Sequence, residues 1–140
     1  MAEVDAERYV EVLRFYARQM ALLDRLDLDG YLGTFTEDGV THHVHHGKKL
    51  EGRAAMRAFA EAALPRYREN VPRHWNDHYE IEQDADGTLT VGYCSLVTLT
   101  DKEGKVRFES TFAVTDELVR AQGKLLVRLR TLVRDRPAAA

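Results

Sequence analysis

Four segments rich in Val, Thr, Leu, Phe and Tyr fill the second half of this 140-residue chain. They cover residues 74–82, 88–100, 105–119 and 124–134. Only short turn signals separate them, at 84–87, 101–104 and 121–123, and each of these stretches ends in Gly. Such an alternation predicts successive hairpins, so this half of the chain should form one antiparallel sheet.

The first half predicts helices. Apolar residues within 5–26 recur at spacings of three and four, which is typical of one face of an amphipathic helix. They are Tyr9, Val12, Leu13, Tyr16, Met20, Leu23 and Leu26. Residues 31–35 predict one or two further helical turns, and the Ala-rich segment 53–64 favours a helix that stops at Pro65. Residues 40–46, bounded by glycines, favour a short strand.

Helices followed by a run of strands indicate an α+β fold. A curved sheet with so few helices should leave a concave face partly uncovered, and a pocket for a small ligand is expected between sheet and helices. We expect one domain over residues 1–135, with a disordered tail at 136–140.

Net charge, hydropathy and cysteine content exclude some classes of function. A net charge of −3 and a pI near 6.1 argue against nucleic acid as the main partner. No apolar run approaches the ~20 residues of a membrane span, and no signal peptide is recognisable. The single Cys94 fits a reducing compartment. A cytoplasmic location without membrane association is therefore expected.

Histidines are the most reactive feature of the sequence. His42, His43, His45 and His46 cluster in one segment, and His74 and His78 lie beside Trp75. Imidazole can transfer protons near neutrality, and it is also a common metal ligand. In a strand, Thr41, His43 and His45 would share one face, but the sequence does not decide whether that face or the opposite one is buried. The spacing of His43 and His45 also permits a metal site completed by His74, His78, Asp24 or Cys94.

Segments 23–38, 51–56, 72–75, 115–120 and 125–134 together resemble the SnoaL-like branch of the nuclear transport factor 2-like superfamily. The resemblance covers about nine tenths of the chain. It implies a cone-shaped α+β fold, in which a bent antiparallel sheet wraps a long N-terminal helix around a pocket. It also implies a homodimer and no cofactor or metal. Similar proteins include scytalone dehydratase-like and bile-acid dehydratase-like enzymes, ketosteroid isomerase, polyketide cyclases and non-catalytic binding proteins.

The resemblance assigns roles to particular residues. It implies that Asp24 orients His74, the catalytic acid and base, and that His43 takes the place of the general base of isomerase-like members. It implies that Arg130 binds a substrate oxygen. Arg128, two residues away, should point to the same face of its strand. Gln19 stands where many members have a tyrosine, and Cys94 stands where scytalone dehydratase-like enzymes have a second pocket histidine.

The resulting hypothesis is a cofactor-independent dehydratase, cyclase or isomerase that acts on a hydrophobic, oxygenated small molecule such as a polyketide- or steroid-like intermediate. Its catalytic residues would be Asp24, His74 and His43. The substrate-binding residues would be Tyr16, Gln19, Trp75, His78, Cys94 and Arg130. Two alternatives remain at this point: a non-catalytic binding or partner subunit, and a metal-dependent enzyme that uses His43 and His45.

Overall fold

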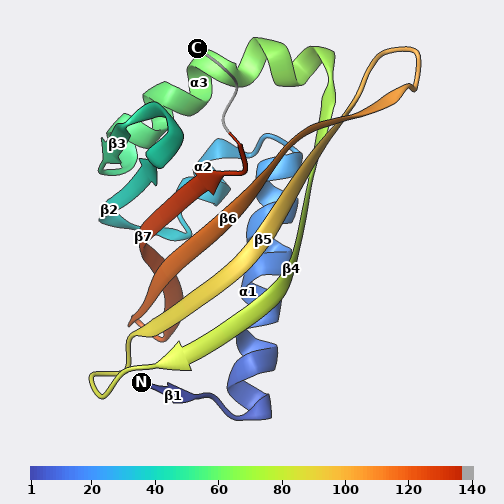
Figure 1. Cartoon of the computed structure of the whole chain (residues 1–140). Helices are drawn as coiled ribbons and strands as arrows, with labels where there is room; N and C mark the ends of the chain where they lie inside the picture. Colours follow the sequence, from blue (N-terminus) through green and yellow to red (C-terminus); the bar gives the residue numbers. More distant parts are fainter. Residues whose placement is uncertain (137–140) are drawn as a thin grey trace.

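A computed structural model of the protein describes residues 1–136 (Figure 1). The helices are α1 (Ala6–Asp24), α2 (Leu28–Leu32) and α3 (Arg53–Glu69), with a 3₁₀ turn at Val44–His46. The strands are β1 (Ala2–Glu3), β2 (Phe35–His43), β3 (Lys48–Glu51), β4 (Val71–Gln83), β5 (Leu89–Thr100), β6 (Val106–Ala121) and β7 (Lys124–Arg134). Residues 137–140 of the predicted tail lie outside the described residues.

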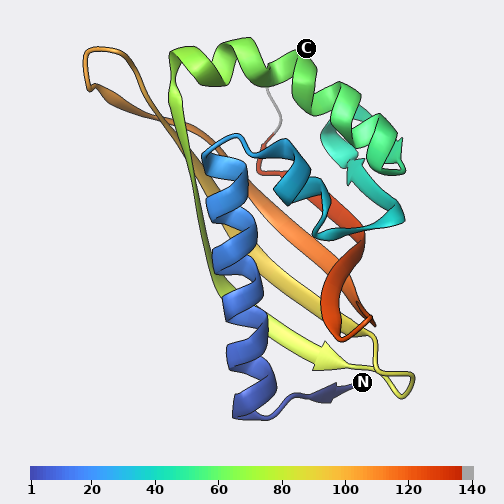
Figure 2. The ribbon, with the colours of Figure 1, turned by 180° about the vertical axis from the view of Figure 1, so that it is seen from behind.

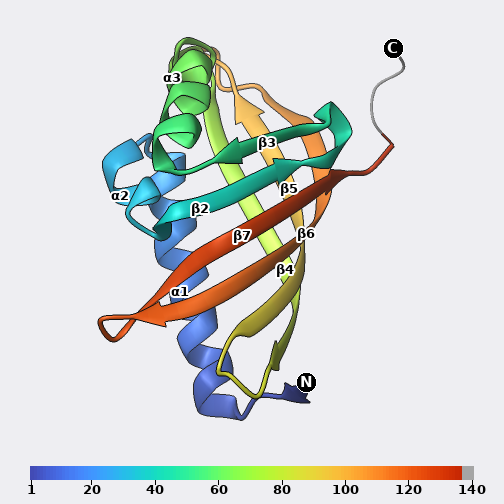
Figure 3. The ribbon, with the colours of Figure 1, turned by 90° about the vertical axis from the view of Figure 1, so that its left-hand side faces the viewer.

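All seven strands belong to one sheet with the order β1-β4-β5-β6-β7-β2-β3. The pairs are antiparallel except β2 with β7, which run parallel. The sheet is strongly curved and does not close (Figure 3). Helix α1 lies along its concave face, and α3 crosses the wide end, as seen from behind in Figure 2. The expected cone-shaped α+β architecture is therefore confirmed.

Helix α1 forms where the apolar periodicity predicted it. The Asp5 carboxylate accepts a hydrogen bond from the Arg8 amide (2.8 Å) and caps the first turn. Val12 and Tyr16, one turn apart, are buried against the sheet. They join a core of Leu32, Phe35, Leu50, Met56, Ile81, Leu89, Val91, Tyr93, Val114, Leu118 and Val127. None of the described helices is long and apolar enough to cross a membrane.

Three expectations on the elements were wrong. The strand predicted at 40–46 ends at His43, because the chain turns there through the 3₁₀ segment to reach β3. Strand β2 already begins at Phe35, so the helical turns predicted up to that residue end at Leu32. Helix α3 continues past Pro65 to Glu69. Proline removes one hydrogen bond from the helix, but the helix continues, and Tyr67 beyond the proline lines a cavity.

A bulge in β7 contradicts the expectation that Arg128 and Arg130 point to the same face of the strand. The pairing with β6 shifts by one residue at Arg128, so the alternation of faces is interrupted there. Arg128 is exposed and binds Glu117 (2.9 Å), whereas Arg130 is only 4% exposed. The two arginines therefore lie in different environments, although their spacing predicted a common face.

A second bulge, in β4, affects His78. The pairing of β4 with β5 shifts between Asp77 and Glu80. His78 adopts a left-handed backbone conformation (φ 60°) in this bulge, and its side chain is exposed.

Candidate active site

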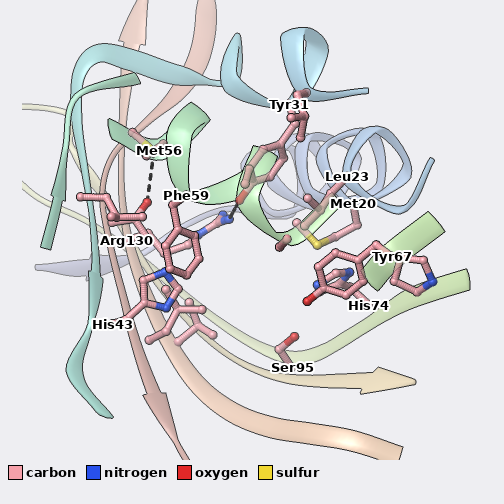
Figure 4. Close-up of a pocket in the computed structure, with 18 of the residues that line it drawn as sticks. Met20, Leu23, Tyr31, His43, Met56, Phe59, Tyr67, His74, Ser95 and Arg130 are labelled. Carbon is pink, nitrogen blue, oxygen red and sulfur yellow. Dashed lines mark hydrogen bonds between the residues drawn. The ribbon is translucent and has the colours of Figure 1, made fainter. Parts of the chain in front are cut away.

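A cavity of about 210 Å³ lies between the concave face of the sheet and the three helices (Figure 4). Side chains from most elements of the fold form its wall. They are Met20, Leu23, Leu26, Leu28, Tyr31, Thr41, His43, Leu50, Met56, Phe59, Ala60, Ala63, Leu64, Tyr67, Pro72, His74, Asn76, Tyr93, Ser95, Val114, Arg130 and Leu132. Most of them are apolar. The few polar groups therefore determine what chemistry the cavity can support.

His74, on β4, contacts Asp24, the last residue of α1. The distance from His74 Nδ1 to Asp24 Oδ1 is 2.6 Å, and the His74 backbone N–H lies 3.2 Å from both carboxylate oxygens. A carboxylate at the C-terminal end of a helix faces the negative end of the helix dipole, so this position does not stabilise α1. Its favourable contacts are instead with His74.

The contact fixes the tautomer of His74. An ionised carboxylate only accepts hydrogen bonds, so the proton of the neutral imidazole lies on Nδ1. Nε2 then carries the lone pair and is free to take a proton from a molecule in the cavity. Once it has done so, the imidazolium is stabilised by the adjacent Asp24 carboxylate.

Arg130 and Asp116 form a buried ion pair beside the cavity. Arg130 Nε and Nη2 donate to the two carboxylate oxygens at 2.9 and 2.8 Å, and the side chains are 5% and 0% exposed. The hydroxyls of Tyr16 (2.7 Å) and Tyr93 (3.1 Å) also donate to Asp116. Burial acts to lower the pKa of Arg130, but the Asp116 carboxylate outweighs it, and the pKa is raised well above its ordinary range.

Gln19 belongs to this buried network and not to the cavity wall. Its Oε1 accepts from Arg130 Nη2 (2.6 Å), its Nε2 donates to Thr34 Oγ1 (2.7 Å), and the residue is fully buried. Tyr16, 1% exposed, is likewise absent from the cavity wall. Neither side chain is placed to touch a substrate, because both are occupied in holding the ion pair.

Tyr31 connects the ion pair with the cavity. Its hydroxyl accepts a hydrogen bond from Arg130 Nη1 (3.1 Å), and its ring lines the cavity (Figure 4). Three of the five Arg130 N–H groups point to Asp116 and Gln19 and a fourth to Tyr31, which leaves one N–H on Nη1. Burial raises the pKa of Tyr31 and outweighs the lowering effect of Arg130, so its hydroxyl stays protonated at neutral pH. Two donors are thus available for one substrate oxygen.

His43, at the end of β2, lies on the cavity wall and stacks on Phe59, with ring centroids 5.0 Å apart. Burial, followed by the neighbouring His45 and His46, lowers the pKa of His43 to about 4. The imidazole is therefore neutral at neutral pH. It can exchange hydrogen bonds with a ligand, but it is a weak base.

The remaining sequence-predicted residues lie elsewhere. Trp75, His78 and Cys94 are not part of the cavity wall. They line a second hollow, which also includes His74, Asn76 and Ser95, and Cys94 is exposed. Side chains alternate along β4, so Trp75 points away from the face that carries His74, and its Nε1 donates to Thr98 (3.0 Å). The structure therefore does not bring these three residues to the cavity.

Residues 1–136 provide no set of ligands that would support the metal hypothesis. No group of three or more His, Cys, Asp or Glu side chains in this part of the chain is arranged to hold a metal ion. The ring centroids of His43 and His45 are 5.8 Å apart. His45 lies in the 3₁₀ turn and not in the strand whose alternation suggested the pair.

Tyr31, Asp116, Asn76 and Ser95 belong to the site or its support, and the sequence did not identify their roles. Asn76 could have been found, since it lies two residues after His74 in a predicted strand and shares its face. Asp116 has no comparable signal, because its partners come from α1, β5 and β7.

Comparison with known proteins identifies the family of this chain. The SnoaL-like domain family matches residues 4–131. The structure of Aln2 from a Streptomyces species is 39% identical over 94% of each chain, with a TM-score of 0.89. ActVI-ORFA from Streptomyces coelicolor is 36% identical over 93% of this chain and 98% of its own, with a TM-score of 0.86.

A protein from Catenulispora acidiphila, solved in complex with S-DNPA, is 32% identical over 93% of this chain and 95% of its own, with a TM-score of 0.82. No curated protein matches this chain in sequence. The family match covers almost the whole fold and every residue that lines the cavity except Leu132. The chain therefore belongs to the SnoaL-like family.

Proposed function

We propose that this protein catalyses cofactor-independent proton transfer on a hydrophobic, oxygenated ring compound, as a dehydratase, cyclase or isomerase. The observation that carries the proposal is the His74–Asp24 pair at the wall of a mostly apolar cavity. A cavity of about 150 Å³ holds benzene. The 210 Å³ available here suits about two fused rings.

In the proposed reaction, His74 Nε2 removes a proton from the carbon next to a substrate carbonyl. The electron pair of the C–H bond moves toward the carbonyl oxygen and forms an enolate. The free N–H of Arg130 and the hydroxyl of Tyr31 stabilise the charge on that oxygen. The imidazolium of His74 then returns its proton, either to carbon or to a hydroxyl group that leaves as water.

The fate of this proton distinguishes the reaction classes. Return to a different carbon is an isomerisation, whereas delivery to a departing hydroxyl is a dehydration. A cyclisation follows when a second oxygen of the substrate adds to the unsaturated product. All three use the same first step, so that step is the one to test.

The experiment is deuterium exchange at C2 of 1-tetralone, a bicyclic aromatic ketone, followed by proton NMR in D₂O. We expect the protein to accelerate this exchange. His74→Asn, whose amide can keep the contact with Asp24, should reduce the acceleration by about 10²–10⁴-fold while binding of the ketone persists. The matched control is His78→Asn, on the same strand but outside the cavity wall.

Two outcomes would contradict the proposal. Exchange that survives in His74→Asn would remove His74 from its role. Binding of 1-tetralone or S-DNPA without any exchange by the unaltered protein would favour the binding-subunit alternative. The homodimer implied by the resemblance stays a prediction, which sedimentation velocity can test.

A further inference from the structure

We propose that Asn76 and Ser95 form a hydroxyl-binding subsite in the cavity, and that this subsite selects ring substrates with a free hydroxyl group. The inference deepens the proposed function, because it describes the substrate of the same cavity. Its binding argument does not depend on the reaction.

Asn76 provides the first observation. Its Oδ1 is buried, lies on a side chain of the cavity wall, and has no hydrogen-bond partner among the described residues. A buried acceptor without a partner costs about 1–3 kcal/mol, and folded proteins contain few such atoms. A ligand that brings a hydrogen-bond donor would satisfy this acceptor.

Ser95 provides the second observation. It lies directly opposite Asn76 in the antiparallel pairing of β4 with β5. Side chains in such a pair have Cβ atoms about 5 Å apart. Ser95 is 8% exposed, lines the same cavity and points into it (Figure 4), and its hydroxyl makes no hydrogen bond within residues 1–136.

The two side chains together match a hydroxyl group. A ligand hydroxyl can donate its proton to Asn76 Oδ1 and accept the proton of Ser95 Oγ. Both protein groups are uncharged, so the subsite favours a neutral hydroxyl over a carboxylate, which would have to give up its hydration without a cationic partner.

The position of the subsite defines where that hydroxyl lies on the substrate. Asn76 follows His74 by two residues on the same strand face, about 7 Å along the strand. Arg130 and His43 lie on the opposite side of the cavity from His74 (Figure 4). The expected substrate class is therefore a bicyclic aromatic ketone with its carbonyl near Arg130 and a ring hydroxyl at the far end.

The test compares three ligands that differ at one position: 6-hydroxy-1-tetralone, 6-methoxy-1-tetralone and 1-tetralone. Their dissociation constants are measured by calorimetry on the unaltered protein. With about 1 kcal/mol for each neutral hydrogen bond, the hydroxy compound should bind roughly 5- to 30-fold more tightly than 1-tetralone. The methoxy compound has no proton to donate and should lose most of this preference.

Variants then assign the preference to the two residues. Asn76→Leu and Ser95→Ala should each reduce it about fivefold, and the double variant should abolish it. Affinity for 1-tetralone should persist in each, which also reports that the variant is folded. Ser95→Ala is the milder change and tests the proposal even if Asn76→Leu does not fold. Ser110→Ala, in β6 and away from the cavity wall, is the matched control.

Equal affinity for all three ligands, no binding of any of them, or a preference that survives in the double variant would each overturn the inference. Deuterium exchange measured on the same samples separates it from the proposed function. Exchange without a hydroxyl preference defeats the subsite alone. A hydroxyl preference without exchange supports the subsite and defeats the catalytic proposal.

Discussion

Asp24→Asn is the substitution that most directly tests how the site is built. It keeps the size of the side chain but replaces one oxygen by an NH₂ group. Both Asp24 oxygens lie 3.2 Å from the His74 backbone N–H, and one lies 2.6 Å from the ring Nδ1. In either orientation of the amide, its NH₂ group faces an N–H of His74, and the negative charge is lost.

The structure sets the size of the effect. As His74 Nε2 takes a proton, positive charge develops about 4 Å from the carboxylate, where a full charge pair is worth ~4 kcal/mol at an effective dielectric constant of ~20. The side chains of His74 and Asp24 are 19% and 10% exposed, so solvent screens part of this energy. With about half of the charge developed in the transition state, roughly 2 kcal/mol remains, which is about 30-fold in rate. Loss of the correct tautomer adds to this, and we expect a total decrease between about 30-fold and about 1,000-fold.

The assay is deuterium exchange at C2 of 1-tetralone, with the dissociation constant of the ketone measured separately. Asp24→Asn should slow exchange while affinity changes by less than about threefold, because the lost interaction acts mainly in the transition state. The control is Asp29→Asn, the same chemical change in a side chain that is 88% exposed and pairs with Arg57. Exchange in Asp24→Asn at the rate of the unaltered protein, or an equal decrease in Asp29→Asn, would refute the reasoning.

Three further predictions concern stability. The pKa of His43 is lowered to about 4, mainly by burial, so the unfolded chain binds more protons between about pH 6.5 and pH 4. The free energy of unfolding should therefore fall as the pH drops through this window, by about 1 kcal/mol for this partly exposed group. Denaturant titrations of His43→Leu should show a weaker pH dependence than those of the unaltered protein. Asp116→Asn leaves the Arg130 charge buried without its partner and should cost about 3–5 kcal/mol of unfolding free energy, measured by urea titration. His78→Gly should keep or raise the melting temperature in calorimetry, because glycine adopts the left-handed backbone of this bulge without strain.

The long hairpins of the sheet could be predicted because each strand is long and each turn carries its own signal. The predicted segment 88–100 agrees with β5 to within one residue at its first position, and 124–134 agrees with β7. Strands β1 and β3 have only two and four residues, too few for a periodic pattern. The bulges at His78 and Arg128 depend on the register between neighbouring strands, β4 with β5 and β6 with β7. The alternation within a single strand does not reveal such a shift, so it gives the wrong face beyond each bulge.

The residues of the candidate site could likewise be predicted only in part. The contact of His74 with Asp24 was expected only through the family resemblance, since fifty residues separate the two and no local rule connects them. Gln19 and Tyr16 were placed on the correct helix, but they hold Arg130 and Asp116 and do not line the cavity. The sequence alone does not distinguish a residue that holds another side chain in place from one that contacts a ligand. The three-dimensional structure makes this distinction.

The two cavity histidines differ in their surroundings, and this difference supports separate roles. His74 Nδ1 lies 2.6 Å from the Asp24 carboxylate, so the positive charge of a protonated ring has a negative charge beside it. His43 has no such partner among its contacts within the described chain: burial and the neighbouring His45, His46 and Lys48 all disfavour its charged form. A base must hold a proton for part of the reaction, and this can occur at low cost only beside Asp24. The proposed proton transfer therefore belongs to His74, and His43 is suited to orienting the substrate as a neutral hydrogen-bonding group.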